Sequence, residues 1–257
     1  MTLRKSVVKA LRALWVIALC CWVSACVTET SGGIPGPKPD AERVAAQLDL
    51  ARGYLEQRDW TRAKAPLRRA LAIDASNVEA HVLSGVLFGA EKELDLAEQH
   101  YREALRLAPN NAQALNNYAS FLYAQGRIAD AVVPLKKLVQ DTGYRARPQA
   151  FESLGIALLG LDDTAGARAA FERALQLNVR LPRANLELAE LALQAGEFDR
   201  AQSQFDFYNR LARPTSRSLC LGYKLARHNG DSNRMASYEL ALKNLFADQA
   251  EACLAPT

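Results

Sequence analysis

Between about residue 44 and residue 250, apolar residues recur three and four places apart, which is the spacing of amphipathic helices. The pattern also repeats as a whole, because the stretch at 48–77 superimposes on the stretch at 83–111 with an offset of about 34 residues. A polar or Gly-containing turn separates two apolar stretches within a unit, as at 58–59, 126–127 and 196–197. We therefore predict pairs of antiparallel helices repeated along the chain.

Small and large residues occupy matching places in successive units, and this arrangement is that of the tetratricopeptide repeat. A single helix pair of this kind cannot bury its apolar face alone and must stack on the next pair. The sequence thus predicts an all-α fold, a right-handed α-solenoid of about six tetratricopeptide repeats. The aligned positions are Ala51, Tyr54, Ala63, Leu67, Ala70 and Leu71 in the first unit, and Gly85, Phe88, Ala97, Tyr101, Ala104 and Leu105 in the second.

The repeats are expected to fill residues 42–250, and a tail follows at 251–257. The last unit matches the pattern only loosely, as expected for a terminal repeat whose outer face meets water. The expected units are 44–77, 78–111, 112–145, 148–181, 182–215 and 216–250.

Residues 1–25 have the plan of a secretory signal peptide, with a basic start, an apolar stretch at 14–23 and small residues behind it. That stretch is about half of the roughly 20 residues that a membrane-spanning helix needs. Its end, VSAC at 23–26, resembles the lipobox of bacterial lipoproteins, in which the cysteine is lipidated and becomes the new N-terminus. The resemblance implies lipidation of Cys26. The alternative is an ordinary signal peptide with a coincidental cysteine.

Residues 26–41 are rich in Gly, Pro, Ser and Thr and lack apolar periodicity, which is typical of a flexible tether. In proteobacterial lipoproteins, Asp directly after the lipidated cysteine is the usual signal for retention in the inner membrane, and this chain has Val27 there. The resemblance therefore implies a lipid anchor in the outer membrane, with the body of the protein facing the periplasm.

Charge and motifs argue against nucleic-acid binding and catalysis. Removing residues 1–25 removes four of the 32 Lys and Arg residues and none of the 28 Asp and Glu residues, so 28 of each remain and no basic footprint for nucleic acid is left. The sequence contains no Gly-rich phosphate loop, GxSxG or HExxH motif. His81, His100 and His228 do not stand at a metal-ligand spacing, and we expect each to be a surface or packing residue. We expect no metal, no cofactor and no enzymatic activity.

A binding surface is the remaining hypothesis. In this repeat family the second, fifth, ninth and twelfth places of each first helix line the concave face, and here most of these places are aliphatic. The predicted groove suits an amphipathic helix or an apolar peptide, and we expect the early repeats to carry the partner. For any one of these residues, the alternative is that it only packs against a neighbouring helix. The predicted groove residues are Leu48, Leu55, Val82, Val86, Tyr123, Ile156, Leu159, Leu186 and Leu193.

A different use of the groove would be a clamp for the C-terminal carboxylate of a peptide. Asn116 and Asn117 resemble the asparagines of repeat domains that bind such a carboxylate. The basic residues that should accompany them are replaced by Gln149 and Glu152, so this is the weaker alternative.

The signal, the lipobox, the tether and the repeats together resemble the PilF/PilW family of type IV pilus biogenesis lipoproteins, the pilotins of the pilus secretin. The stretch at 219–246, LCLGYKLARHNGDSNRMASYELALKNLF, is similar to the last unit of that family, and the stretch at 45–71 is similar to its first. The resemblance implies a non-enzymatic chaperone that binds secretin subunits and promotes their outer-membrane localisation and multimerisation. The alternative is a general periplasmic scaffold lipoprotein for cell-wall enzymes or outer-membrane protein assembly.

Two further cysteines, Cys220 and Cys253, would lie in the oxidising periplasm. Cys220 is expected near the start of the first helix of the last repeat. An antiparallel second helix, roughly 232–246, returns the chain to the same end. We expect a disulfide if the two α-carbons approach within about 7 Å. Two free thiols are the alternative.

We predict that the Cys26→Ser variant is folded but mislocalised, because the helix repeats need nothing from residue 26. Membrane fractionation together with circular dichroism checks this prediction. A variant that still fractionates with the outer membrane, with unchanged electrophoretic mobility, would contradict the lipobox interpretation.

Overall fold

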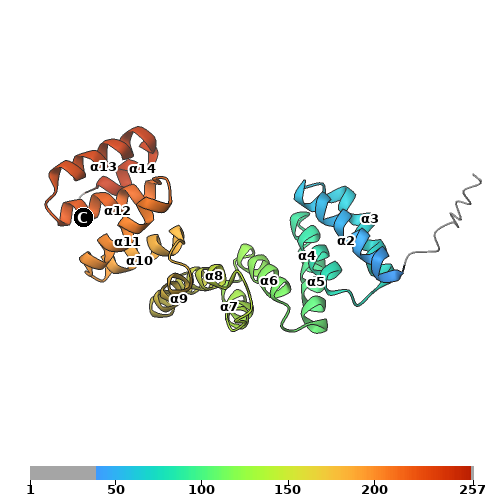
Figure 1. Cartoon of the computed structure of the whole chain (residues 1–257). Helices are drawn as coiled ribbons and strands as arrows, with labels where there is room; N and C mark the ends of the chain where they lie inside the picture. The colour runs from blue at the N-terminus through green and yellow to red at the C-terminus, as the bar shows by residue number, and fades with distance from the viewer. Residues whose placement is uncertain (1–38, 256–257) are drawn as a thin grey trace, which may run out of the picture. The chain divides into compact units, whose positions relative to one another are not determined.

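The computed structural model describes residues 39–255. This part of the chain forms thirteen α-helices and no strand, which confirms the predicted all-α fold (Figure 1). Successive helix pairs fall in successive predicted repeats. The pairs are α2 (Asp40–Glu56) and α3 (Trp60–Ile73), α4 (Val78–Ala90) and α5 (Leu94–Leu107), α6 (Ala112–Ala124) and α7 (Ile128–Leu138), α8 (Arg147–Leu159) and α9 (Thr164–Leu177), α10 (Pro182–Gln194) and α11 (Phe198–Leu211), and α12 (Ser216–His228) and α13 (Ser232–Leu245), followed by α14 (Ala247–Leu254).

The turn inside every pair contains one residue with left-handed backbone, at φ between 57° and 74°. Three of these residues are glycines, which adopt this conformation at little cost, whereas a residue with a Cβ pays about 1–2 kcal/mol. Their positions follow the repeat period and show the two-residue insertion between the third and fourth turns. The residues are Arg58, Lys92, Gly126, Asp162, Gly196 and Gly230.

Short polar side chains determine where many of the helices begin. Each accepts a hydrogen bond from the backbone N–H three residues further on, and such an N-cap stabilises a helix by about 0.5–2 kcal/mol. Aspartates cap second helices and asparagines cap first helices. The capping residues are Asp59, Asp163 and Asp231, and Asn77 and Asn111.

The two helices of a pair approach closely because a small residue on the first faces a large residue on the second. Gly155 in α8 lies against the ring of Phe171 in α9, and a Cβ built on Gly155 would come within 2.6 Å of that ring. Gly85 faces Tyr101 in the same way, at 2.7 Å. Phe171 is fully buried, so its ring has no free space into which to move. The absence of a Cβ therefore allows the close approach of these helices.

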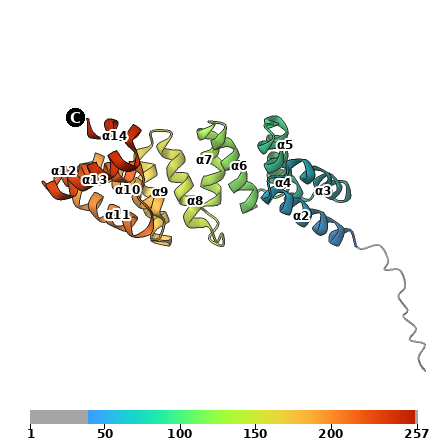
Figure 2. The same ribbon diagram turned by 90° about the horizontal axis from the view of Figure 1, so that it is seen from above.

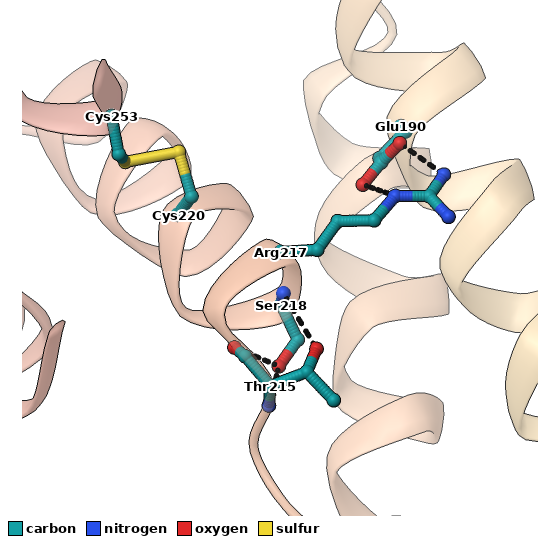
Figure 3. The surroundings of a disulfide bond; sticks show 6 residues. All are labelled: Glu190, Thr215, Arg217, Ser218, Cys220 and Cys253. Atoms are coloured by element: carbon teal, nitrogen blue, oxygen red, sulfur yellow. Dashed lines mark hydrogen bonds and ion pairs between the residues drawn. A yellow bond between two sulfur atoms is a disulfide. The ribbon is translucent and has the colours of Figure 1, made fainter. Parts of the chain in front are cut away.

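The last pair is closed by α14, which lies against α12 and α13 (Figure 2). Leu219, Leu242 and Ala250, one from each helix, form a small buried cluster. A disulfide joins Cys220 in α12 to Cys253 in α14, with 5.7 Å between the α-carbons (Figure 3). This is the pair expected from the sequence. The expected tail at 251–257 differs, because the chain stays helical to Leu254, where the disulfide and the cluster hold it.

We predict opposite effects for two glycine substitutions. Gly155→Ala should lower the free energy of unfolding by about 1–3 kcal/mol, because its Cβ would overlap a buried ring. Gly53→Ala in α2 should raise it by about 0.5–1 kcal/mol, because no atom lies within 4 Å of the added Cβ and alanine favours the helix. Urea unfolding of both variants checks this. Equal effects would show that the close approach at Gly155 is not needed.

We also predict that Cys220 and Cys253 are oxidised in the mature protein. The bond spans 33 residues, and closing such a loop stabilises the fold by about 4 kcal/mol in the chain-entropy model. Thiol labelling of the denatured, unreduced mature chain should find no reactive cysteine, and labelling after reduction should find two. Two reactive thiols before reduction would contradict the prediction.

Candidate functional site

The predicted groove positions separate into two groups in the structure. Three aliphatic side chains in the fifth place of a first helix are buried: Leu48 and Leu186 are 5% and 6% exposed, and Val82 is 0% exposed. They pack inside the fold against neighbouring helices, and their assignment to an accessible groove is wrong. The polar residues in the same place, Asn116 and Glu152, are half-buried. Side chains in the ninth and twelfth places, such as Ile156 and Tyr123, remain accessible.

The ninth and twelfth places of the first helices form one surface, here called the first-helix face. Tyr123 and Ile156 line one pocket of about 180 Å³ on it. Tyr123 is 43% exposed at the end of α6, and Ile156 is half-buried in α8. The floor of the pocket is Ala119 and Leu135, and its rim carries Ser120, Ser153 and Arg183. A Tyr ring over an aliphatic floor offers a partner both an apolar contact and a hydrogen-bonding hydroxyl.

A half-buried carboxylate lies beside this pocket. The Glu152 Oε1 accepts a hydrogen bond of 2.8 Å from the backbone N–H of Ala184, at the start of α10. Burial raises the pKa of Glu152, and the charge of Glu187 adds to this, while the Ala184 hydrogen bond and the charge of Arg183 act against it. A carboxylate at this place would repel the C-terminal carboxylate of a peptide, which weighs against the clamp alternative.

An ion-pair network joins α10 to α12 on the same face. Arg217 donates to both oxygens of the buried Glu187, at 2.8 and 2.5 Å. Its Nε donates to Glu190 at 2.6 Å (Figure 3). The hydrogen bond to Glu187 is the largest cause of the raised pKa of Arg217. Arg183 Nε lies 3.8 Å from Glu187. The network connects the two helices, and removing Arg217 would leave the buried Glu187 without its main partner.

Within residues 39–255, no group of three or more His, Cys, Asp or Glu side chains is arranged to hold a metal ion. In the same part of the chain, no helix combines the length and the apolar character needed to cross a bilayer. What the first-helix face offers is a set of small pockets with apolar floors and polar rims.

Comparisons with known proteins show the family to which the chain belongs. Tetratricopeptide repeat models match residues 48–112, 90–150 and 158–208. The type IV pilus assembly protein PilF of Pseudomonas aeruginosa is 38% identical over 243 residues, which are 93% of this chain and 96% of PilF. The chain belongs to the PilF family.

Two solved structures of PilF-type proteins superimpose on this one. That of P. aeruginosa PilF has a TM-score of 0.78 at 38% identity and covers 84% of this chain and 98% of that one. That of PilW, described as a widely conserved type IV pilus biogenesis factor, has a TM-score of 0.69 at 27% identity and covers 82% and 98%. The resemblance to the PilF/PilW family, stated from the sequence, is confirmed. YrrB, a repeat protein with a peptide-binding site, shares only the fold, at 17% identity and a TM-score of 0.57.

The remaining site residues predicted for this PilF-family chain do not line the pocket at Tyr123. Leu55, Val86 and Leu159 are half-buried against their neighbours, so each also contributes to packing. Leu193 lines a further pocket with side chains of α12. Cys26 lies outside the described residues, and its lipidation stays a prediction.

The pocket at Tyr123 lies between the third and fourth repeats. A larger pocket with an apolar lining, of about 420 Å³, lies in the first two repeats and includes Leu71, Leu87 and Phe88, so binding by the early repeats stays a prediction.

One pair of residues was missed from the sequence. His81 in α4 and His100 in α5 meet with their Nδ1 atoms 3.0 Å apart. The Nε2–H of His81 donates to the Ala75 carbonyl at 3.0 Å, so in the neutral pair the Nδ1–H of His100 donates to His81. The ring of His100 also stacks on Phe88. The two histidines are 19 residues apart, and the register between α4 and α5 brings their side chains together.

We predict that this pair makes stability depend on pH. Burial, and to a lesser extent the charge of His81, lowers the pKa of His100. The folded state therefore favours the neutral ring, and the stability it contributes is present above the unfolded pKa of about 6.5 and is lost as the pH falls below it. Unfolding at pH 5–8 should show a shallower pH dependence for His100→Gln than for the wild type. The control His228→Gln should follow the wild type, and identical curves for all three would contradict the prediction.

Proposed function

We propose that this protein is a non-enzymatic assembly factor of the type IV pilus machinery that binds secretin subunits. Lipidated Cys26 would hold it at the periplasmic face of the outer membrane. The first-helix face would hold a segment of the secretin subunit, so that subunits reach the membrane and multimerise there. The lipid supplies the location, and the groove supplies the specificity.

The observation that carries this proposal is the match to PilF along nearly the full length of both chains. Shared repeats alone would give local matches, because tetratricopeptide repeats occur in many unrelated proteins. Here the alignment takes in 93% of this chain and 96% of PilF. PilF is named as a type IV pilus assembly protein, and PilW is described as a pilus biogenesis factor.

The geometry of the face supports a protein partner. Pockets of this size, with an aliphatic floor and an exposed tyrosine at the edge, suit one or two apolar side chains of a helix or an extended segment. Tyrosine is one of the residues that most often dominate binding energy at interfaces.

A general periplasmic scaffold is the alternative, in which the same anchor and face serve cell-wall enzymes or outer-membrane protein assembly. The two functions differ in the protein that is captured. Co-purification from membranes, with identification of the captured proteins, separates them. A secretin among them supports the proposal, whereas cell-wall enzymes without a secretin support the alternative.

We predict that Tyr123→Glu weakens secretin capture about ten-fold or more, because it places a charge over the apolar floor and removes an aromatic contact. Capture of purified secretin subunits by the lipid-free mature chain measures this. The side chain is 43% exposed, so the variant should unfold at the same temperature as the wild type.

The matched control is Val133→Glu on α7, which alters a 70% exposed apolar side chain away from the pocket lining. It should capture secretin as the wild type does. Equal capture by the wild type, Tyr123→Glu and Val133→Glu would show that secretin does not bind at this pocket.

A further inference from the structure

Positive charge collects at three successive junctions between repeats. A junction here runs from the last turn of one second helix to the first turn of the next first helix. The three junctions together hold nine Lys and Arg residues and one acidic residue, Asp141. The two earlier junctions, 70–81 and 104–115, hold one Arg, one Asp and one Glu, so the positive excess belongs to the later repeats. The three junctions are residues 135–150, 174–185 and 208–219.

Side-chain contacts join the starts of α8, α10 and α12, the helices into which these junctions lead. Glu152 in the second turn of α8 accepts a hydrogen bond from the backbone N–H of Ala184 in the first turn of α10. Arg217 in the first turn of α12 donates to Glu187 in the second turn of α10. The three loops before these helices therefore lie along one edge, here called the arginine edge.

Six of the nine basic side chains have an ordinary explanation. Lys136, Lys137 and Arg210 lie in the last turn of α7 or α11, where cations compensate the helix dipole. Arg147 donates to the Val139 carbonyl at 2.7 Å.

The last two of these six face carboxylates. Arg217 pairs with Glu187 and Glu190, and the Nε of Arg183 lies 3.8 Å from Glu187. Two arginines and two carboxylates thus balance, and together they add no net charge to the arginine edge.

The other three arginines have no such explanation. They are Arg145, Arg180 and Arg213, one in each loop. All three are exposed, and none forms an ion pair with a carboxylate of residues 39–255. Each stands just before the N-terminal end of a first helix, where the helix dipole favours an anion. Their charge is therefore available to an external anionic partner.

Exposed apolar side chains accompany these arginines. Val179, the neighbour of Arg180, is 58% exposed, and Leu177 in the same junction is 39% exposed. Tyr144, the neighbour of Arg145, is half-buried. An apolar side chain flanked by cations suits the surface of a bilayer, because the apolar group enters the acyl boundary while the cations stay at the headgroups.

We infer that the arginine edge docks on the anionic phospholipid surface of the membrane that carries this protein. The inference rests on the membrane location in the proposed function, and it does not depend on the secretin. The predicted anchor at Cys26 precedes the start of α2, so it joins the fold at the end of a first helix that corresponds to the arginine edge. A polybasic patch beside a lipid anchor strengthens the attachment that the lipid provides.

A flat anionic surface fits this edge better than an acidic protein segment does. Arg145, Arg180 and Arg213 stand on three separate loops, and none of them lines a pocket on the first-helix face. Outside the ion pairs and the Arg147 hydrogen bond, the three junctions carry six exposed cations. Clusters of about 4–8 Lys and Arg residues next to a membrane anchor are typical of binding to anionic lipid.

Vesicle binding by the lipid-free mature chain tests the inference. Phosphatidylcholine vesicles with about one third phosphatidylglycerol should bind the wild type, and pure phosphatidylcholine should not. Each of Arg145→Gln, Arg180→Gln and Arg213→Gln should weaken binding about five-fold, and the triple variant should weaken it about 100-fold. At about 1 M salt, where the Debye length is near 3 Å, most of the wild-type binding should be lost.

The matched control removes the same charge from the first two repeats. It combines Arg58→Gln, Arg69→Gln and Lys92→Gln, which change three exposed basic residues outside the arginine edge, and it should bind almost as the wild type does. The apolar contact is tested by Val179→Ser, which should weaken binding. Its control is Leu240→Ser on α13, whose side chain is 61% exposed and which should not weaken binding.

Each remaining outcome would overturn the inference. No binding of the wild type to either vesicle, or equal binding by the two triple variants, would show that the arginine edge does not recognise anionic lipid. Loss of secretin capture by the Arg145, Arg180 and Arg213 triple variant, with vesicle binding unchanged, would assign the edge to an acidic protein segment. A thermal unfolding scan accompanies each variant, and the three single variants decide the matter if the triple variant is unstable.

The vesicle assay and secretin capture fail independently. If vesicle binding does not depend on the arginine edge while secretin is still captured, this inference is wrong and the proposed function stands. If secretin is not captured while the arginine edge still binds anionic vesicles, the proposed function is wrong and this inference stands.

Discussion

The close approach of two helices at a small residue, glycine or alanine, is the constraint on which the rest of this structure depends. Where Gly85, Gly155 and Gly222 face an aromatic ring on the partner helix, that ring fills the volume that a side chain would otherwise take. The pairs at Ala51 and Ala119 have a methyl group instead and share their clusters with the smaller Leu67 and Leu135. The volume is thus divided differently between the small and the large residue from pair to pair, and each pair keeps an apolar face on which the next can stack.

This packing decides which side chains are left for binding. Once the helices of a pair are this close, an aliphatic residue in the fifth place of the first helix can be enclosed, as Val82 is. The ninth and twelfth places project beyond the contact and collect on one face, where Tyr123 and Leu193 line separate pockets. The ion pairs of Arg217 then hold two neighbouring repeats in register beneath that face. The fold therefore provides a row of small, differently rimmed pockets, which suits an extended or helical segment of a partner.

Much of this could be predicted from the sequence, because a repeat with small and large residues in matching places leaves few folds possible. The helix pairs, the turn at Gly126 and the pairing of Cys220 with Cys253 all follow from local spacing and antiparallel geometry. The exposure of single groove residues could not be predicted, since Val82 and Val86 have the same chemistry and differ only in what covers them. The contact of His81 with His100 was missed because it depends on the register between two helices, which hydrophobic periodicity does not report.

The most direct test of the central claim is the state of the secretin in cells that lack this protein. Outer and inner membranes are separated, and the secretin multimer and the monomer are quantified in each. The account predicts that without the protein most secretin is monomeric and absent from the outer membrane, and that wild-type protein restores the multimer there. Unchanged amounts of multimer in the outer membrane of cells without the protein would contradict it.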